Sequence, residues 1–198
     1  MMKKLIFKKN ILFVVLIFLS SCFHSKDNNS NAITELEGVW ETGCLIWNDS
    51  VIYGIETMAF ISNTFTSKLT LYSDANCSLP GIAEESTGNY LIGNKIILSS
   101  GQTVNAIDEN ITRWSLTSLD EENTFSSNVE NFCEYSDWET NVKKDVSDCH
   151  VYIGRKFNYG IFKYDGDSIL WGDYATGDGI TINNRPTQLS SKKYTRIN

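Results

Sequence analysis

Apolar and polar side chains alternate along much of the chain after residue 35. Within residues 64–72, the odd-numbered positions from 65 to 71 share one face, and mostly polar residues occupy the other. A period of two is typical of a strand that is buried on one side. Residues 51–61 form another β-rich run. A further strand face is predicted at Trp40, Thr42, Cys44 and Ile46.

Turn residues separate these runs. Gly93-Asn94 stands between the apolar runs 90–92 and 95–98 and predicts a hairpin. Asp165-Gly166-Asp167 separates residues 159–164 from residues 168–174 and predicts a second one. Short strands at regular spacing, with almost no long helical period, favour an all-β sandwich or an antiparallel barrel.

Residues 120–150 interrupt this rhythm. The segment is polar and acidic, and residues 128–141 are expected to contain a short helix. Long ordered loops are uncommon without a function, so the segment is a candidate interaction surface. The alternative is a loop that only caps one end of the fold.

The first 21 residues read as a signal peptide. Four lysines between Lys3 and Lys9 precede the uninterrupted apolar run 11–19. This order of charged and apolar residues is typical of secretory signals. The run is about half of the roughly 20 residues that a membrane-spanning helix needs, so we do not expect a permanent span.

The apolar run ends in Leu19-Ser20-Ser21-Cys22. This tetrapeptide resembles the lipobox of bacterial lipoproteins, which implies cleavage before Cys22 and a diacylglycerol on its sulfur, with fatty acyl chains such as palmitate as the membrane anchor. Phe23, rather than an acidic residue, follows the cysteine; by resemblance to enterobacterial sorting signals this favours the outer membrane. The alternative is an ordinary signal peptide with an unrelated cysteine. Residues 22–34 are mostly polar and are expected to form a tether.

The charge of the mature chain limits its partners. Removing residues 1–21 leaves 13 basic and 24 acidic residues, a formal charge of −11. Nucleic-acid binding depends on neutralising phosphates, so a chain this acidic is a poor candidate for it. The same charge disfavours a domain that lies flat on an anionic membrane.

Four cysteines remain besides Cys22. An even number in an oxidising compartment indicates two disulfides, for which three connectivities exist. Cys44–Cys77 and Cys133–Cys149 are favoured because each closes a moderate loop between neighbouring segments. Zinc is the competing interpretation, but the spacing contains neither a C-x-x-C pair nor a histidine cluster.

Gly38-Val39-Trp40 opens the predicted domain, which spans residues 35–198. The tripeptide resembles the G-x-W start of lipocalins, and larger parts of the chain resemble uncharacterised bacterial envelope lipoproteins. The lipocalin resemblance implies a closed barrel of about eight to ten antiparallel strands, with Trp40 at the floor and Arg196 of the last strand packed over it. Unlike lipocalins, the chain shows no clear helix after the last strand.

No set of residues predicts catalysis. His24 falls in the tether and His150 next to Cys149, and neither belongs to a triad or a metal-binding spacing. The acidic turn at residues 165–167 is explained by turn chemistry better than by calcium. We therefore expect no catalytic residue, no metal and no cofactor, and a protein that is not an enzyme.

Two functions remain. The first is a lipid-anchored envelope protein that binds a small apolar ligand in the barrel mouth. The second is a protein-interaction or adhesion module that uses residues 120–150 to contact an envelope partner. Trp138 is the candidate anchor of that surface if it is exposed, since tryptophan is enriched at binding hot spots; packing in the core or within the loop is the favoured interpretation. Trp114 is expected in the core. A filled barrel would favour the second function, and an open apolar cavity the first.

Overall fold

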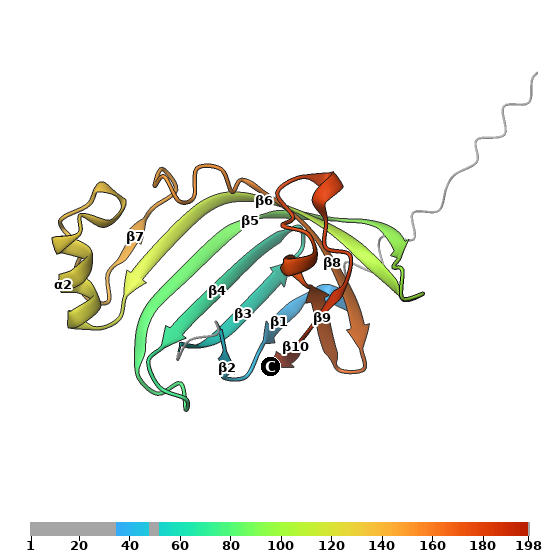
Figure 1. The fold of residues 1–198 in the computed structure, drawn as a ribbon, viewed down its shortest axis with the longest axis horizontal. Coiled ribbons are helices and arrows are strands. Elements are labelled where there is room, and N and C mark those ends of the chain that lie inside the picture. Colours follow the sequence, from blue (N-terminus) through green and yellow to red (C-terminus); the bar gives the residue numbers. More distant parts are fainter. Residues whose placement is uncertain (1–34, 48–51, 198) are drawn as a thin grey trace, which may run out of the picture.

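The structure, a computed structural model, describes residues 35–47 and 52–197. The described chain is mostly β-sheet (Figure 1). The strands and helices, in order, are β1 (Gly38–Glu41), β2 (Leu45–Ile46), β3 (Tyr53–Ile61), β4 (Thr64–Tyr72), β5 (Pro80–Ile97), β6 (Thr103–Ser118), α2 (Glu121–Val129), η1 (Phe132–Glu134), β7 (Lys143–Asp145), β8 (Phe157–Asp165), β9 (Ser168–Gly172), η2 (Tyr174–Thr176), η3 (Ile182–Asn184) and β10 (Leu189–Ile197).

The sheet closes into an antiparallel barrel, as predicted. The strand order is β1-β10-β9-β8-β6-β5-β4-β3, and β1 also pairs with β3, which joins the two ends. Eight strands of the described chain therefore form the barrel, while β2 extends β3 and β7 pairs with β6. Closure satisfies the edges that an open sheet would leave unpaired.

The first and last strands meet at the floor of the barrel. Trp40 lies opposite Arg196 in the β1–β10 register. The Arg196 guanidinium lies 4.5 Å from the centre of the Trp40 indole, and Trp40 Nε1 donates to Leu36 O over 2.7 Å. Gly38 has a φ of +124° and faces Arg196, so a side chain at this position would be strained. The predicted contact between Trp40 and Arg196 is confirmed.

One predicted hairpin is wrong in position. Residues 93 and 94 do not turn the chain, because β5 continues through them to Ile97. The register with β6 shifts between Ile92 and Lys95, so Gly93-Asn94 lies at a bulge, and the turn falls at residues 98–102. A Gly-Asn pair serves either feature, since both need an irregular backbone. The hairpin at residues 165–167 is confirmed, with Gly166 at a φ of +63°.

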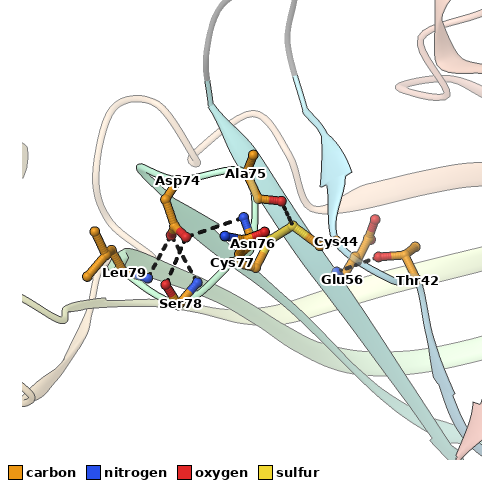
Figure 2. Close-up of a disulfide and its surroundings, with 9 residues drawn as sticks. All are labelled: Thr42, Cys44, Glu56, Asp74, Ala75, Asn76, Cys77, Ser78 and Leu79. Carbon is orange, nitrogen blue, oxygen red and sulfur yellow. Dashed lines mark hydrogen bonds between the residues drawn. A yellow bond between two sulfur atoms is a disulfide. The ribbon is translucent and has the colours of Figure 1, made fainter.

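The predicted strand face from residue 40 to 46 is interrupted. Trp40 and Thr42 are buried, but the chain leaves the sheet between β1 and β2, and Ile46 is exposed. The Cys44–Cys77 disulfide ties this interruption to the turn after β4 (Figure 2). Asp74 shapes that turn by accepting from the backbone N–H groups of Ser78 and Leu79.

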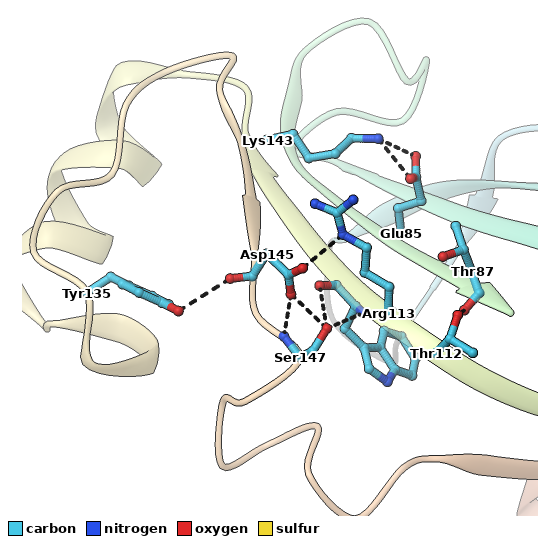
Figure 3. A network of polar contacts seen from close by, with 9 residues as sticks. Glu85, Thr87, Thr112, Arg113, Tyr135, Lys143, Asp145 and Ser147 are labelled. Carbon is cyan, nitrogen blue, oxygen red and sulfur yellow. Dashed lines mark hydrogen bonds and ion pairs between the residues drawn. The ribbon is translucent and has the colours of Figure 1, made fainter.

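Residues 120–150 form a stapled excursion that packs on the extended ends of β5 and β6. Its helix, α2, begins and ends earlier than the predicted range 128–141. The Cys133–Cys149 disulfide is present as predicted. Ion pairs join β7 to the barrel strands, with Lys143 bound to Glu85 and Arg113 bound to Asp145 (Figure 3).

Three apolar clusters organise the described part of the chain, the smallest of them formed by Leu98, Val104 and Ile161. The largest one fills the floor of the barrel; its fully buried members include Phe60, Ile107, Phe162 and Ile169. The second lies between β6 and the excursion and contains Leu116, Trp138, Val146 and Tyr152. Of the helices in the described ranges, none combines the length and apolar character needed to cross a bilayer.

Candidate functional site: a cavity in the barrel

The barrel is filled at its floor but not at its mouth, the end formed by the start of β8, the end of β9 and the start of β10. There a cavity of about 610 Å³ remains. Side chains along a barrel strand point alternately inward and outward, so residues two positions apart on one strand line the cavity. Ser67 and Ser86, which face each other across β4 and β5, line it with small side chains that leave room.

The wall of the cavity is partly aromatic. Trp114 stacks on Tyr152, two residues after the excursion, with ring centres 4.8 Å apart. Lys192 lies over the Trp47 ring, with its Nζ 3.5 Å from the centre. The apolar and aromatic lining residues are Trp47, Met58, Phe65, Leu69, Ile111, Trp114, Phe157, Trp171, Tyr174, Ile180 and Tyr194.

Glu56 of β3 brings a carboxyl group into the cavity. Its Oε2 accepts from the Tyr194 hydroxyl over 2.6 Å, and its Oε1 accepts from Ser67 Oγ over 3.3 Å. Burial raises the pKa of this carboxyl, and these hydrogen bonds offset part of the rise. The same burial raises the pKa of Tyr194, so its hydroxyl keeps the proton that it donates to Glu56.

Glu109 of β6 brings a second carboxyl group. Asn158 Nδ2 donates to its Oε2 over 2.5 Å and lies 2.8 Å from the Tyr174 hydroxyl. Burial, together with repulsion from Glu56, raises the pKa of Glu109 to about 7 despite the bond from Asn158. Its Oε1 is buried and has no hydrogen-bond partner within the described residues. Glu109 is therefore an acceptor whose bonding is incomplete.

Glu84 of β5 links the cavity to the excursion. Its Oε2 accepts from the Tyr152 hydroxyl over 2.7 Å. Tyr152 also belongs to the apolar cluster that contains the Cys133–Cys149 disulfide. The stapled excursion therefore supports one side of the cavity mouth, which agrees with its predicted alternative role as a cap.

Of the two interpretations of Trp138, packing within the loop is the one that the structure shows, and an exposed anchor is excluded. Trp138 is only 5% exposed, its Nε1 donates to Phe132 O over 3.2 Å, and its ring contacts Phe132 and Tyr135. In so polar a loop, the aromatic residues must supply the loop's own core, and Trp138 is the centre of that core. Trp114, expected in the core, is half-buried and faces the cavity.

Some of the other predicted site residues are described by the structure, and some lie outside it. Cys44, Cys77, Cys133 and Cys149 form the two expected disulfides. The signal peptide (1–21), Cys22 and the tether (22–34) lie outside the described residues. Within the described ranges, no three His, Cys, Asp or Glu side chains converge to form a metal-binding group.

The sequence interpretation missed Glu56 and Glu109. Both occupy inward positions of their strands, with Met58 two residues after Glu56, and Ile107 and Ile111 on either side of Glu109. A charged residue at an apolar position of a period-two pattern is the signal that could have identified them. It was hidden because 24 acidic residues offer many alternatives.

Comparison with protein-family models and with curated proteins gives no match for this sequence.

Proposed function

We propose that this protein is a non-enzymatic, lipid-anchored protein of the bacterial envelope that binds a small, largely apolar ligand inside its barrel. The observation that carries the ligand proposal is the unfilled mouth of the barrel, a cavity of about 610 Å³. Ligand pockets are typically roughly 300–1,000 Å³, mostly apolar, with a few oriented polar groups. Trp47 and Trp114 provide large apolar surfaces in the cavity, and Glu56 and Glu109 provide the polar groups.

The envelope location rests on the N-terminal sequence. The signal-like segment 1–21 and the lipobox-like residues ending in Cys22 support export and lipid attachment. Two or more acyl chains would hold the protein stably at a membrane. The outer membrane is the proposed destination.

A neutral apolar dye tests the ligand proposal. N-phenyl-1-naphthylamine should bind the soluble domain, residues 23–198, and its fluorescence should rise. Ser86→Phe places a ring in the cavity and should abolish this binding. Thr87→Phe, the matched control, adds the same ring at the adjacent residue on the opposite face of β5 and should leave binding intact. Equal binding by the wild type and Ser86→Phe would contradict the proposal.

One observation favours the second function, a protein-interaction or adhesion module. Phe125 and Val129 of α2 lie one helical turn apart and are 70% and 63% exposed. With Trp138 buried, these two residues are the candidate contact surface of the excursion. A photo-crosslinker at position 125 should then give one defined adduct in cells, while one at position 91, another exposed apolar position, should give none. The same pattern from both positions would exclude this function.

A further inference from the structure

The cavity contains an acceptor whose hydrogen bonding the described residues leave incomplete. Glu109 is 5% exposed and lines the cavity. Asn158 occupies its Oε2, but Oε1 has no partner within residues 35–47 and 52–197. A buried acceptor without a donor costs free energy, so a donor brought by a ligand would be favoured at this position.

The charges around Glu109 favour a cation. Five carboxyl side chains line the cavity, against two basic ones, Arg155 and Lys192. Across the described residues, the ion pairs leave Glu56, Glu84 and Glu109 without a basic partner at ion-pair distance. Lys192 lies over the Trp47 ring and is attracted by Glu56 and Asp173 without reaching ion-pair distance to either. The five carboxyl side chains are Glu56, Glu84, Glu109, Asp173 and Asp178.

The remaining wall favours an apolar body. Trp171 is almost fully buried, and its ring stacks on Phe60 with centres 5.9 Å apart. Its Nε1 is a buried donor with no partner within the described chain. A ligand that fits the cavity would therefore combine a cationic donor with an apolar body.

We propose that the cavity selects a small organic cation, a protonated amine on an aromatic or aliphatic body, whose N–H group donates to Glu109 Oε1. The inference rests on the proposed ligand-binding function and specifies its ligand class. A charged N–H bonded to a buried carboxylate is stronger than the same bond between neutral groups. Binding would complete the bonding of Glu109 and offset the repulsion among the cavity carboxyls.

Binding should also depend on pH. Burial raises the pKa of Glu109 to about 7, so the carboxylate that an amine prefers is depleted below neutral pH. The titratable groups around it are Glu56 on β3, Tyr174 on η2 and Tyr194 on β10. Both tyrosines have raised pKa values and stay neutral. Further off, Glu84, Arg155, Lys192, Asp173 and Asp178 line the same cavity. Amine affinity should therefore rise with pH through about 7.

Calorimetric titration with three probes of similar shape tests the inference on the soluble domain. Tryptamine carries a cation, tryptophol a neutral hydroxyl and indole-3-propionate an anion. Tryptamine should bind about 10–100-fold more tightly than tryptophol, the range that a charged hydrogen bond supplies, and indole-3-propionate should bind most weakly. Glu109→Gln should remove the preference for tryptamine over tryptophol together with its pH dependence.

Glu85→Gln is the control, because Glu85 is bound to Lys143 in the ion pairs that join β7 to the barrel. This variant should keep the preference for tryptamine. Equal or weaker binding of tryptamine relative to tryptophol, or a preference that survives in Glu109→Gln, would overturn the amine inference. If the neutral apolar dye still bound, the proposed function would stand; loss of dye binding as well would overturn both.

Discussion

The buried carboxyl of Glu109 costs the folded state free energy whenever it is ionised, because few groups in the cavity replace the water that it loses. Residues that lower stability in this way are typical of functional sites, where activity and stability oppose each other. Asn158 positions the Glu109 carboxyl by donating to Oε2, but it leaves Oε1 without a hydrogen bond. A purely structural role would be served better by an apolar side chain of similar size.

Glu109→Gln should stabilise the domain in a pH-dependent way. The pKa of Glu109 rises from an ordinary 4.5 to about 7 on folding. Below pH 4.5 both states are protonated and no stability is lost; as pH rises to 7 the unfolded state releases its proton first, so the folded state loses stability. The glutamine variant should therefore match the wild type near pH 4 and exceed it by about 3 kcal/mol at pH 8. Urea unfolding at both pH values measures this, and equal effects at the two would contradict it.

Among single residues, the sequence predicted best those whose partners lie in neighbouring segments of the chain. The four cysteines were paired correctly because neighbouring segments with moderate loops favour one connectivity. For Trp138 the sequence favoured packing but left exposure open, because the pattern of the excursion does not reveal that its aromatic residues pack on one another. Local periodicity identifies the face of a strand, but it cannot say what a separate loop buries.

At the scale of elements, alternation located the strands better than their ends. The run at residues 64–72 became β4, as predicted, because Phe65 and Leu69 face inward along its length. The hairpin expected at residues 93–94 failed because the long pairing of β5 with β6 outweighs one local turn signal. A bulge lets the ladder continue through that signal.

The excursion between β6 and β8 depends on its disulfide. The helix α2 of this segment has no buried residue, so little buried apolar area holds the helix in place. Replacing Cys133 and Cys149 by alanine should lower the free energy of unfolding by about 3 kcal/mol. Hydrogen exchange should quicken first in residues 120–152. Replacing Cys44 and Cys77 is the comparison and should cost about as much without faster exchange in the excursion; identical exchange patterns in both variants would count against this assignment.

At the scale of the whole molecule, the contact between the first and last strands closes the barrel. Trp40→Ala should lower the free energy of unfolding by about 3–5 kcal/mol, as a large-to-small core change. Arg196→Ala should cost less, and a double-mutant cycle should give a coupling of about 0.5–2 kcal/mol. Arg113→Ala is the control, because Arg113 is bound to Asp145, and its effect on the free energy of unfolding should add to that of Trp40→Ala. A coupling near zero for Trp40 and Arg196 would mean that their contact contributes nothing to closure.

The chain that carries residues 1–22 is expected to be held at a membrane through Cys22. Cys22→Ser should block lipid attachment and leave either uncleaved precursor or soluble product, because the serine hydroxyl cannot replace the cysteine thiolate. Detergent partitioning and mass spectrometry of the N-terminus measure the outcome. A Cys22→Ser protein that is still acylated at mature length would show that the lipobox assignment is wrong.

Two separate segments pair with the edge of β6 that β5 leaves open. β8 pairs with residues 105–110 and β7 with residues 115–117. Between them, Lys156 O accepts from Ile111 N, and Trp114 O accepts from Val146 N. β6 therefore offers no row of free backbone groups on which a strand of another molecule could grow. If the excursion detached, the edge of β6 at residues 115–117 would become such a template. The Cys133–Cys149 disulfide, which holds the excursion at the cavity mouth, would therefore also prevent copies of the protein from pairing into fibres.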